Sequence, residues 1–299
     1  MENSLQTFNV NGVTLHYSKT GSGQPLIFLP GNVSDYRTWS NIYQKFADGY
    51  ECYVLSRRFQ HPAKYIMNGD SSVAANTADI AAFIKDKNLS PAIVVGHSNG
   101  GLVTLNLAIQ HPELVHSVIA EEPMFVPALV RNPKNPLQLI GLMLKNFNAG
   151  KSFARLGMKG IGPSIKALAK GDSQTAQEAF INGVTDGKKT LATLDELTKQ
   201  QLADNIANVA AEDPFNNNIK LTDLAKIKCK VLLLSGTESP YVFHYINEEV
   251  KKQISQSELI IISGAGHWIH IDQTDKFVTT ISNFLKSKAA ANMVFEQAG

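Results

Sequence analysis

A serine stands between two glycines in the stretch VVGHSNGG, which runs from Val94 to Gly101. Ser98 follows Gly96 by two residues and precedes Gly100 by two, a spacing typical of a serine on a sharp turn between a strand and a helix. Glycine is needed at both positions because a side chain there would collide with neighbouring backbone. A serine held on such a turn can act as a nucleophile. Glycine and serine are also ordinary turn residues, so the interpretation depends on the surrounding elements.

A serine nucleophile needs a base that accepts its proton, and His267 is the candidate. It stands in the glycine-rich segment GAGHW, directly after an apolar run that predicts a strand. A loop after a strand of a parallel sheet lies at the carboxyl edge of that sheet, where a base can meet the nucleophile. His270, three residues further on, is interpreted as a structural neighbour. No pattern assigns a role to His61, His97 or His244.

The elements on both sides of Ser98 fit the predicted turn. Residues 91–96, PAIVVG, form an apolar run that predicts a strand, and residues 101–114 predict a helix directly after it. Residues 25–31 and 115–123 predict further buried strands. Because strands and helices alternate, we expect a parallel sheet with crossover helices. A strand thus precedes the serine and a helix follows it, which is the context that a nucleophile on this turn requires.

The same alternation extends over most of the chain. The Asn11-Gly12 pair between two alternating runs is a strong hairpin signal. A polar loop and a helix are predicted within 34–49 and a helix at 73–89, with a strand at 50–56 between them. After residue 227 the alternation resumes with a strand, a helix, a strand and a helix, at 229–236, 245–254, within 257–268 and at 275–288.

Residues 123–227 interrupt the alternation and have no convincing strand. Thr198 with Gln201 fits a capping box for a helix over 198–213. An insertion of this length must pack against the sheet edge or be disordered, and its apolar helical patterns favour packing. The helical patterns cover 136–147, 164–171, 173–184 and 198–213.

We therefore predict a core formed by residues 1–122 and 228–299 and a helical cap formed by residues 123–227. The cap is expected to cover the candidate site and to set substrate preference. Its candidate apolar lining residues are Met124, Phe125, Leu139, Leu142, Met143 and Phe147.

Three segments stand in the order PLIFLPGN, GHSNGG and GAGHWIHIDQTDKF. With them the chain resembles the α/β-hydrolase superfamily, in the form that carries a helical cap, over roughly residues 8–122 and 228–287. The resemblance implies an α/β fold with a mostly parallel, doubly wound sheet and an inserted cap. It also implies an oxyanion hole made by the backbone N–H groups of Asn32 and Asn99. Superfamily members that use an aspartate nucleophile, such as haloalkane dehalogenases and epoxide hydrolases, differ because this chain has Ser98.

The triad acid is where the chain departs from the superfamily pattern. Most relatives have an aspartate in a Gly-x-x-Asp segment after the strand written here as VLLLSG, but this chain has GTESP, with Ser239 in that position. A serine cannot stabilise an imidazolium by charge. Glu122, at the end of the strand SVIAEEP, is the favoured acid, since some members place the acid there. Glu121 and Glu238 are the alternatives, and all three can also be ordinary surface or strand-end residues.

The favoured function is hydrolysis of a small or medium acyl substrate, a carboxylic ester, lactone or thioester, through an acyl-enzyme on Ser98. His267 would carry the proton and Glu122 would orient His267. Hydrolysis of a carbon–carbon bond in a diketone is the alternative on the same triad. A ligand-binding or sensor protein that retains a slow triad is the alternative from another class. The fold alone does not decide the substrate.

Composition narrows the class of protein. The 299 residues include 28 basic and 26 acidic side chains, and the net charge of +2 gives no electrostatic case for nucleic acid or an anionic membrane. With neither a signal peptide nor an apolar run long enough to span a bilayer, we expect a cytoplasmic protein. Cys52 and Cys229 are expected to be free thiols. The cysteines and histidines lack the close spacing of a zinc site, so we expect no metal or cofactor and a small-molecule substrate as the partner. The oligomeric state is not predicted.

Overall fold

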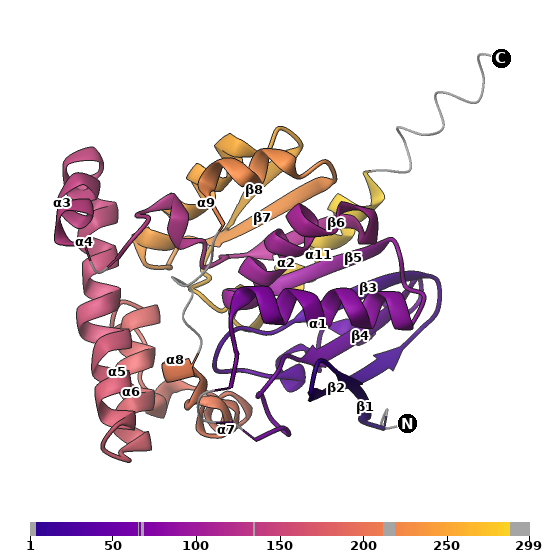
Figure 1. Ribbon diagram of the computed structural model, residues 1–299, viewed down its shortest axis with the longest axis horizontal. Coiled ribbons are helices and arrows are strands. Elements are labelled where there is room, and N and C mark those ends of the chain that lie inside the picture. The colour runs from indigo at the N-terminus through magenta and orange to yellow at the C-terminus, as the bar shows by residue number, and fades with distance from the viewer. Residues whose placement is uncertain (1–3, 65, 67–68, 134, 212–218, 288–299) are drawn as a thin grey trace.

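The computed structural model describes residues 4–287 except 65, 67–68, 134 and 212–218. Its eight strands form one sheet in the order β1-β2-β4-β3-β5-β6-β7-β8 (Figure 1). The first two strands pair antiparallel around the predicted Asn11-Gly12 hairpin, and β2 is also antiparallel to β4. The other pairs are parallel. The strands are β1 Gln6–Val10, β2 Val13–Thr20, β3 Gln24–Leu29, β4 Tyr50–Ser56, β5 Ala92–His97, β6 Val115–Glu121, β7 Lys230–Gly236 and β8 Ser257–Ile262.

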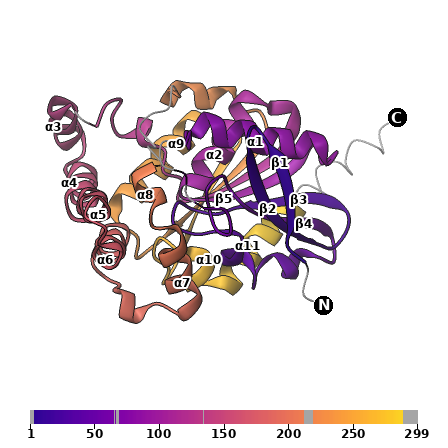
Figure 2. The same cartoon turned by 60° about the horizontal axis from the view of Figure 1, so that its bottom comes forward.

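Helices cover both faces of the sheet because alternate residues of its central strands are apolar on both faces. In β3, Ile27 and Leu29 pack into one hydrophobic cluster, and Leu26 and Phe28 pack into the other. Figure 2 shows α1, α2 and α9 on one side of the sheet and α10 and α11 on the other. The predicted mostly parallel, doubly wound sheet is confirmed. These helices are α1 Val73–Asp86, α2 Asn99–Gln110, α9 Tyr241–Gln253, α10 Ile269–Asp272 and α11 Thr274–Lys286.

One predicted core helix is wrong. Residues 34–49 form two short 3-10 helices, Tyr36–Trp39 and Tyr43–Phe46. The Asp35 side chain caps the first of them by accepting a hydrogen bond from the Arg37 N–H at 3.1 Å. Trp39, Ile42 and Phe46 pack into the same hydrophobic cluster, and their helical spacing explains why the sequence pattern predicted one continuous helix instead of two short 3-10 turns.

In the part that the structure describes, the insertion between β6 and β7 consists of helices joined by turns and loops, without a strand. Helices α4 and α5 are joined by a π-helical turn, Leu156–Ile161. The sequence patterns did not predict α4. In both views the helices α3 to α6 stand at the margin of the molecule, away from the sheet (Figures 1 and 2). The bounds are α3 Pro136–Lys145, α4 Phe147–Arg155, α5 Gly162–Leu168, α6 Ser173–Val184, α7 Glu196–Asn205 and α8 Asn208–Ala211.

The predicted capping box at Thr198 is wrong. Helix α7 begins at Glu196, and its N-cap is Asp195, whose side chain accepts a hydrogen bond from the Thr198 N–H at 3.0 Å. A carboxylate three residues before the threonine caps the helix equally well, so the helix starts one turn earlier than predicted.

Helix α7 attaches the insertion to the loop after β3. The Asn205 amide donates to Asp35 at 2.8 Å, and Arg37 lies 2.7 Å from Asp204. Asp35 is fully buried and Asn205 almost so. This contact joins the insertion to the loop that carries Asn32, three residues before Asp35.

Two lysines attach the insertion to the other edge of the sheet. The ammonium of Lys188 lies 2.7 Å from the carboxylate of Glu238, which follows β7. Lys189 forms an ion pair with Asp272, five residues after His267. The insertion therefore contacts the loops that follow β3 and β7 and helix α10, which follows β8.

Three sequence predictions concern the surroundings of the site. Within the described ranges, no helix combines the length and apolar character that a bilayer span needs. Cys52 and Cys229 are both free thiols, and Cys52 is buried. Phe147 was a candidate lining residue, but 64% of its surface is exposed.

Candidate active site

Ser98 occupies the turn between β5 and α2 in a left-handed backbone conformation, with φ 51° and ψ −117°. Glycines are required beside it for the steric reason inferred from the sequence. A Cβ atom on Gly96 would lie 2.4 Å from the carbonyl oxygen of Gly100, and one on Gly100 would lie 2.5 Å from the carbonyl oxygens of Leu29 and Pro30. The serine is thus held at the carboxyl edge of the sheet by close backbone packing.

Backbone hydrogen bonds fix this turn to the end of β6. The Ser98 N–H donates to the carbonyl of Glu121 at 2.9 Å. The Ser98 carbonyl accepts from Leu102, within α2, and from Met124 at 3.2 Å. The serine and the two glutamates that end β6 are therefore positioned by one set of contacts.

His267 and Glu122 form a buried pair. Nδ1 of His267 lies 2.7 Å from Oε2 of Glu122, the residue favoured as the acid from the sequence. The other oxygen of Glu122 accepts a hydrogen bond from the Gly236 N–H at 2.9 Å and from the Ser235 hydroxyl at 3.3 Å. Because an ionised carboxylate only accepts, Nδ1 carries the ring proton, and Nε2 keeps a lone pair.

Phe243 of α9 stacks on the ring of His267, with centroids 4.0 Å apart and planes 20° apart. Together with the Glu122 contact, this stack fixes the orientation of the imidazole. Sequence reasoning missed Phe243, and its place in an amphipathic helix gave no signal for this role.

The alternative acids lie elsewhere. Glu238 is exposed and pairs with Lys188, so it does not reach His267. Glu121 is fully buried but faces a different histidine, His270. Glu121 is the last residue of β6, and Glu122 follows it with a positive φ of 43°, and the two adjacent carboxylates contact two separate histidines.

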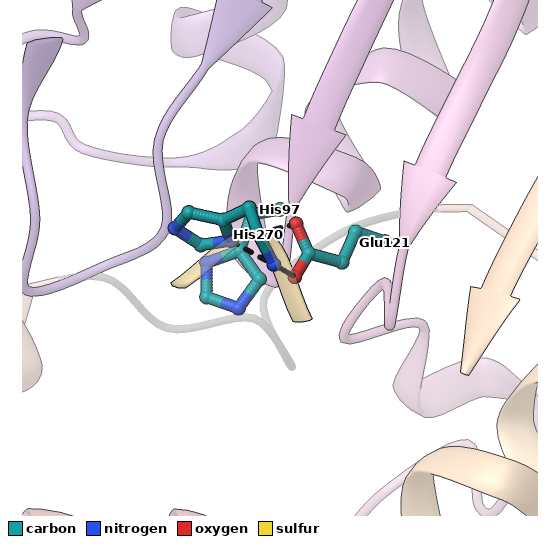
Figure 3. A group of neighbouring side chains, drawn as sticks. All are labelled: His97, Glu121 and His270. Carbon is teal, nitrogen blue, oxygen red and sulfur yellow. Dashed lines mark hydrogen bonds and ion pairs between the residues drawn. The ribbon is translucent and has the colours of Figure 1, made fainter. Parts of the chain in front are cut away.

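A second buried cluster, formed by Glu121, His270 and His97, lies next to the candidate triad (Figure 3). Glu121 accepts hydrogen bonds from the backbone N–H of His270 at 3.0 Å and from its Nδ1 at 2.8 Å. Nε2 of His270 lies 2.9 Å from the Thr38 hydroxyl. Nε2 of His97 donates to the carbonyl of His267 at 2.9 Å, so this cluster supports the backbone of the candidate base.

The ligand atoms of these three residues lie within 4.8 Å of one another, a spacing that a metal ion can bridge. The sequence gave no sign of this cluster, because its members come from three separate elements. Hydrogen bonds occupy the Glu121 carboxylate and the ring nitrogens of His270, and only Nδ1 of His97 lacks a partner among the described residues. Internal hydrogen bonds account for the arrangement without a metal.

The loop Pro30-Gly31-Asn32 lies against Ser98. A Cβ atom on Gly31 would stand 3.5 Å from the Cβ atom of Ser98. The buried guanidinium of Arg57 donates to the Gly31 carbonyl at 3.0 Å and to the Pro30 carbonyl at 3.1 Å. Arg57 therefore holds the loop from behind, and this role was also not predicted. Asn99, the other predicted oxyanion residue, is the first residue of α2.

Among the described residues, no hydrogen bond joins the Ser98 hydroxyl to the His267 ring. In ligand-free enzymes such contacts are often long and tighten when substrate binds. The structure brings His267 and Glu122 into contact and fixes Ser98 beside Glu121 through its backbone.

Burial controls the protonation of the His267–Glu122 pair. It raises the pKa of the Glu122 carboxyl to about 7, against the opposing effect of the Gly236 N–H. It lowers the pKa of His267 to about 3. Both shifts favour the uncharged forms, because the surroundings hydrate neither ion.

These shifts predict a pH dependence. The active form needs an ionised Glu122 and a neutral His267, so one added proton on either group abolishes activity. Since the raised pKa of Glu122 is about 7, kcat/KM should fall as the pH drops through about 7. In Glu122→Gln only the imidazole can take that proton, and burial lowers its pKa, so the residual activity should persist to lower pH. An acid limb at the same pH in both proteins would contradict this assignment.

Comparisons with known proteins come from sequence and from structure. A family model described as alpha/beta hydrolase fold matches residues 24–274. The sn-1-specific diacylglycerol lipase ABHD11 of Xenopus tropicalis is 22% identical over 275 residues, which cover 91% of this chain and 81% of the relative. The 2-hydroxy-6-oxo-6-phenylhexa-2,4-dienoate hydrolase of Comamonas testosteroni is 22% identical over 284 residues and 92% of each chain.

Two solved structures have similar folds. MenH from S. aureus superposes with a TM-score of 0.70 at 20% identity, over 91% of this chain and 98% of that chain. A thermophilic esterase from Thermogutta terrifontis superposes with a TM-score of 0.71 at 17% identity, over 96% of this chain and 99% of that chain. At these identities the likeness establishes the shared fold.

Proposed function

Because the chain belongs to the α/β-hydrolase fold family, we propose that it is a serine hydrolase that cleaves a carboxylic ester, lactone or thioester through an acyl-enzyme on Ser98. The observation that carries the proposal is the buried contact of 2.7 Å between His267 and Glu122, next to a serine on a strained, glycine-flanked turn. The relatives named as a lipase and an esterase support the choice of acyl substrates. The reaction needs no cofactor.

In the acylation step, the Ser98 hydroxyl attacks the carbonyl carbon of the substrate. Nε2 of His267 takes the hydroxyl proton, and the carboxylate of Glu122 stabilises the imidazolium that forms. The tetrahedral intermediate carries its negative charge on the former carbonyl oxygen. The backbone N–H groups of Asn32 and Asn99 would stabilise that charge, with each donor contributing about 3 kcal/mol.

Collapse of this intermediate breaks the bond to the leaving group, which receives the proton from Nε2 of His267. Water then attacks the acyl-enzyme on Ser98, again with His267 as the base, and releases the acid. Phe243 would contribute by covering one face of the imidazole, on which it stacks.

The insertion, residues 123–227, would act as the cap over this site. In support, it contacts the loops after β3 and β7 and helix α10 through Asn205, Lys188 and Lys189. These segments follow strands at the carboxyl edge of the sheet, which is the edge that carries Ser98. The cap helices are thus expected to set the preferred acyl chain.

The alternative function, hydrolysis of a carbon–carbon bond, is supported by one relative, which is named 2-hydroxy-6-oxo-6-phenylhexa-2,4-dienoate hydrolase. Both reactions use the same groups, and they differ in the bond that breaks. A direct comparison of an ester series with such a dienoate on the purified protein separates them.

The test of the proposed function is a panel of p-nitrophenyl esters of increasing acyl length, with fluorophosphonate labelling of the active serine. We expect a burst of p-nitrophenol followed by steady turnover, with one preferred chain length. Turnover of the dienoate and of no ester would favour the carbon–carbon alternative. A burst without turnover would indicate a sensor that retains a slow triad.

A further inference from the structure

We propose that the outer face of the insertion docks onto an anionic lipid surface. The starting observation is charge. Between Arg131 and Lys170 the sequence has eight of the 28 basic residues and neither aspartate nor glutamate, which leaves 20 basic against 26 acidic residues elsewhere. The chain therefore has one cationic segment, while the rest of it is net negative. The small net charge of +2 averages these two parts and does not exclude binding to an anionic membrane. The basic residues are Arg131, Lys134, Lys145, Lys151, Arg155, Lys159, Lys166 and Lys170.

Helix α3 exposes an apolar stripe. Leu137, Ile140 and Leu144 are 73%, 52% and 85% exposed. Their spacing of three and four residues places them on one side of the helix. Leu142, which points the other way, is buried. The helix thus buries one apolar side in the insertion and leaves the other uncovered.

The rod formed by α4, the π-helical turn and α5 exposes a second stripe, in which apolar and basic side chains alternate. Its exposed positions recur every three or four residues, as on one side of a helix. Its large apolar members, Phe147, Met158 and Ile165, are 64%, 72% and 41% exposed. The lysines beside them are Lys151, Lys159 and Lys166. We call the two stripes together the outer face.

The lysines of the outer face are available for a partner. Two other basic residues of the segment form ion pairs with neighbouring elements, Lys145 with Glu249 and Arg155 with Asp186. Lys151, Lys159 and Lys166 make no ion pair within the part of the chain that the structure describes. Large apolar side chains beside unpaired cations mark a surface that another body covers.

An anionic bilayer surface fits this pattern best. Apolar side chains of an amphipathic helix enter the boundary between headgroups and acyl chains, and lysines at its rim contact lipid phosphates. Each lysine near an anionic surface strengthens binding about fivefold. A second copy of this chain fits poorly, because two outer faces without acidic residues in this segment would repel each other. The inference is independent of the proposed function.

The test is flotation of the full chain with vesicles, without substrate. We expect binding to vesicles of phosphatidylcholine and phosphatidylglycerol in equal parts, little binding to pure phosphatidylcholine, and weaker binding at high salt. The variant Lys151→Gln, Lys159→Gln, Lys166→Gln should bind anionic vesicles on the order of a hundredfold more weakly. The variant Leu137→Ser, Ile140→Ser, Leu144→Ser should lose about tenfold or more.

The matched control changes three exposed lysines outside the segment, Lys85→Gln, Lys228→Gln and Lys286→Gln, and should bind like the unmodified chain. All of these side chains are exposed, so the variants are expected to fold, and a thermal melt checks this. The proposal would be overturned if the chain bound equally to both kinds of vesicle or if the control lost as much binding as the triple lysine variant. Unchanged binding of the triple lysine variant would overturn it too. If the chain formed a dimer in solution, and the triple variant at Leu137, Ile140 and Leu144 abolished that dimer, the outer face would bind a second copy instead.

Discussion

Replacement of Ser98 by alanine is expected to reduce ester turnover to less than a hundredth of the unmodified rate and to abolish fluorophosphonate labelling. Without the hydroxyl no acyl-enzyme forms, and loss of the nucleophile in comparable triads costs up to about 10⁶-fold in kcat. The side chain makes no hydrogen bond in the described part of the chain, so the fold should persist. The measurement is kcat on the best ester of the panel, beside a thermal melt.

The control for this variant is Ser263→Ala, which changes an exposed serine in the loop between β8 and His267. It should leave turnover and labelling unchanged. Activity of Ser98→Ala above a hundredth of the unmodified value would exclude Ser98 as the nucleophile, provided that its melting temperature is unchanged.

Glu122→Gln is expected to lower kcat by about ten-thousand-fold, the cost of the same exchange in a well-studied serine triad. The neutral amide cannot compensate the positive charge of the imidazolium. It also presents an N–H₂ group, which favours the wrong tautomer of His267. The buried contact of 2.7 Å gives the carboxylate this influence. Single-turnover and steady-state rates on one ester separate the loss in acylation from the loss in deacylation.

The two alternative acids provide matched controls. Glu238→Gln removes an exposed ion pair with Lys188 and should leave kcat nearly unchanged. Glu121→Gln keeps an oxygen that accepts from the backbone N–H of His270, and we expect a much smaller loss than in Glu122→Gln. If Glu121→Gln or Glu238→Gln lost as much activity as Glu122→Gln, the assignment of the acid would be wrong.

The sheet was predictable from sequence because short-range patterns determine its strands and helices. The glycines beside Ser98 restrict its turn sterically, and alternating strands and helices place strand ends at one edge. The choice of Glu122 rested on the resemblance to the superfamily, because Ser239 stands where most members have the acid and some members place the acid at the end of the strand that precedes Glu122.

The parts that sequence did not predict depend on distant packing. The Glu121–His270–His97 cluster joins two strand ends to a short helix after β8, and no spacing in the chain encodes that meeting. Phe243 and Arg57 look like an ordinary core residue and an ordinary charged residue until the fold places them. The prediction of a helix within 34–49 was wrong because the helical spacing of Trp39, Ile42 and Phe46 does not distinguish one helix from two short 3-10 turns.

Both Ser98 and Glu122 have positive φ angles, 51° and 43°, in a region that costs an L-residue about 1–2 kcal/mol. A chain optimised for folding alone would have glycine at both positions. The rest of the molecule therefore sustains two local conformations that oppose its own stability, and glycine at either would remove a reacting or orienting group. The most stable sequence for this backbone and the most active one are thus different sequences, and they diverge at the residues to which we assign the chemistry.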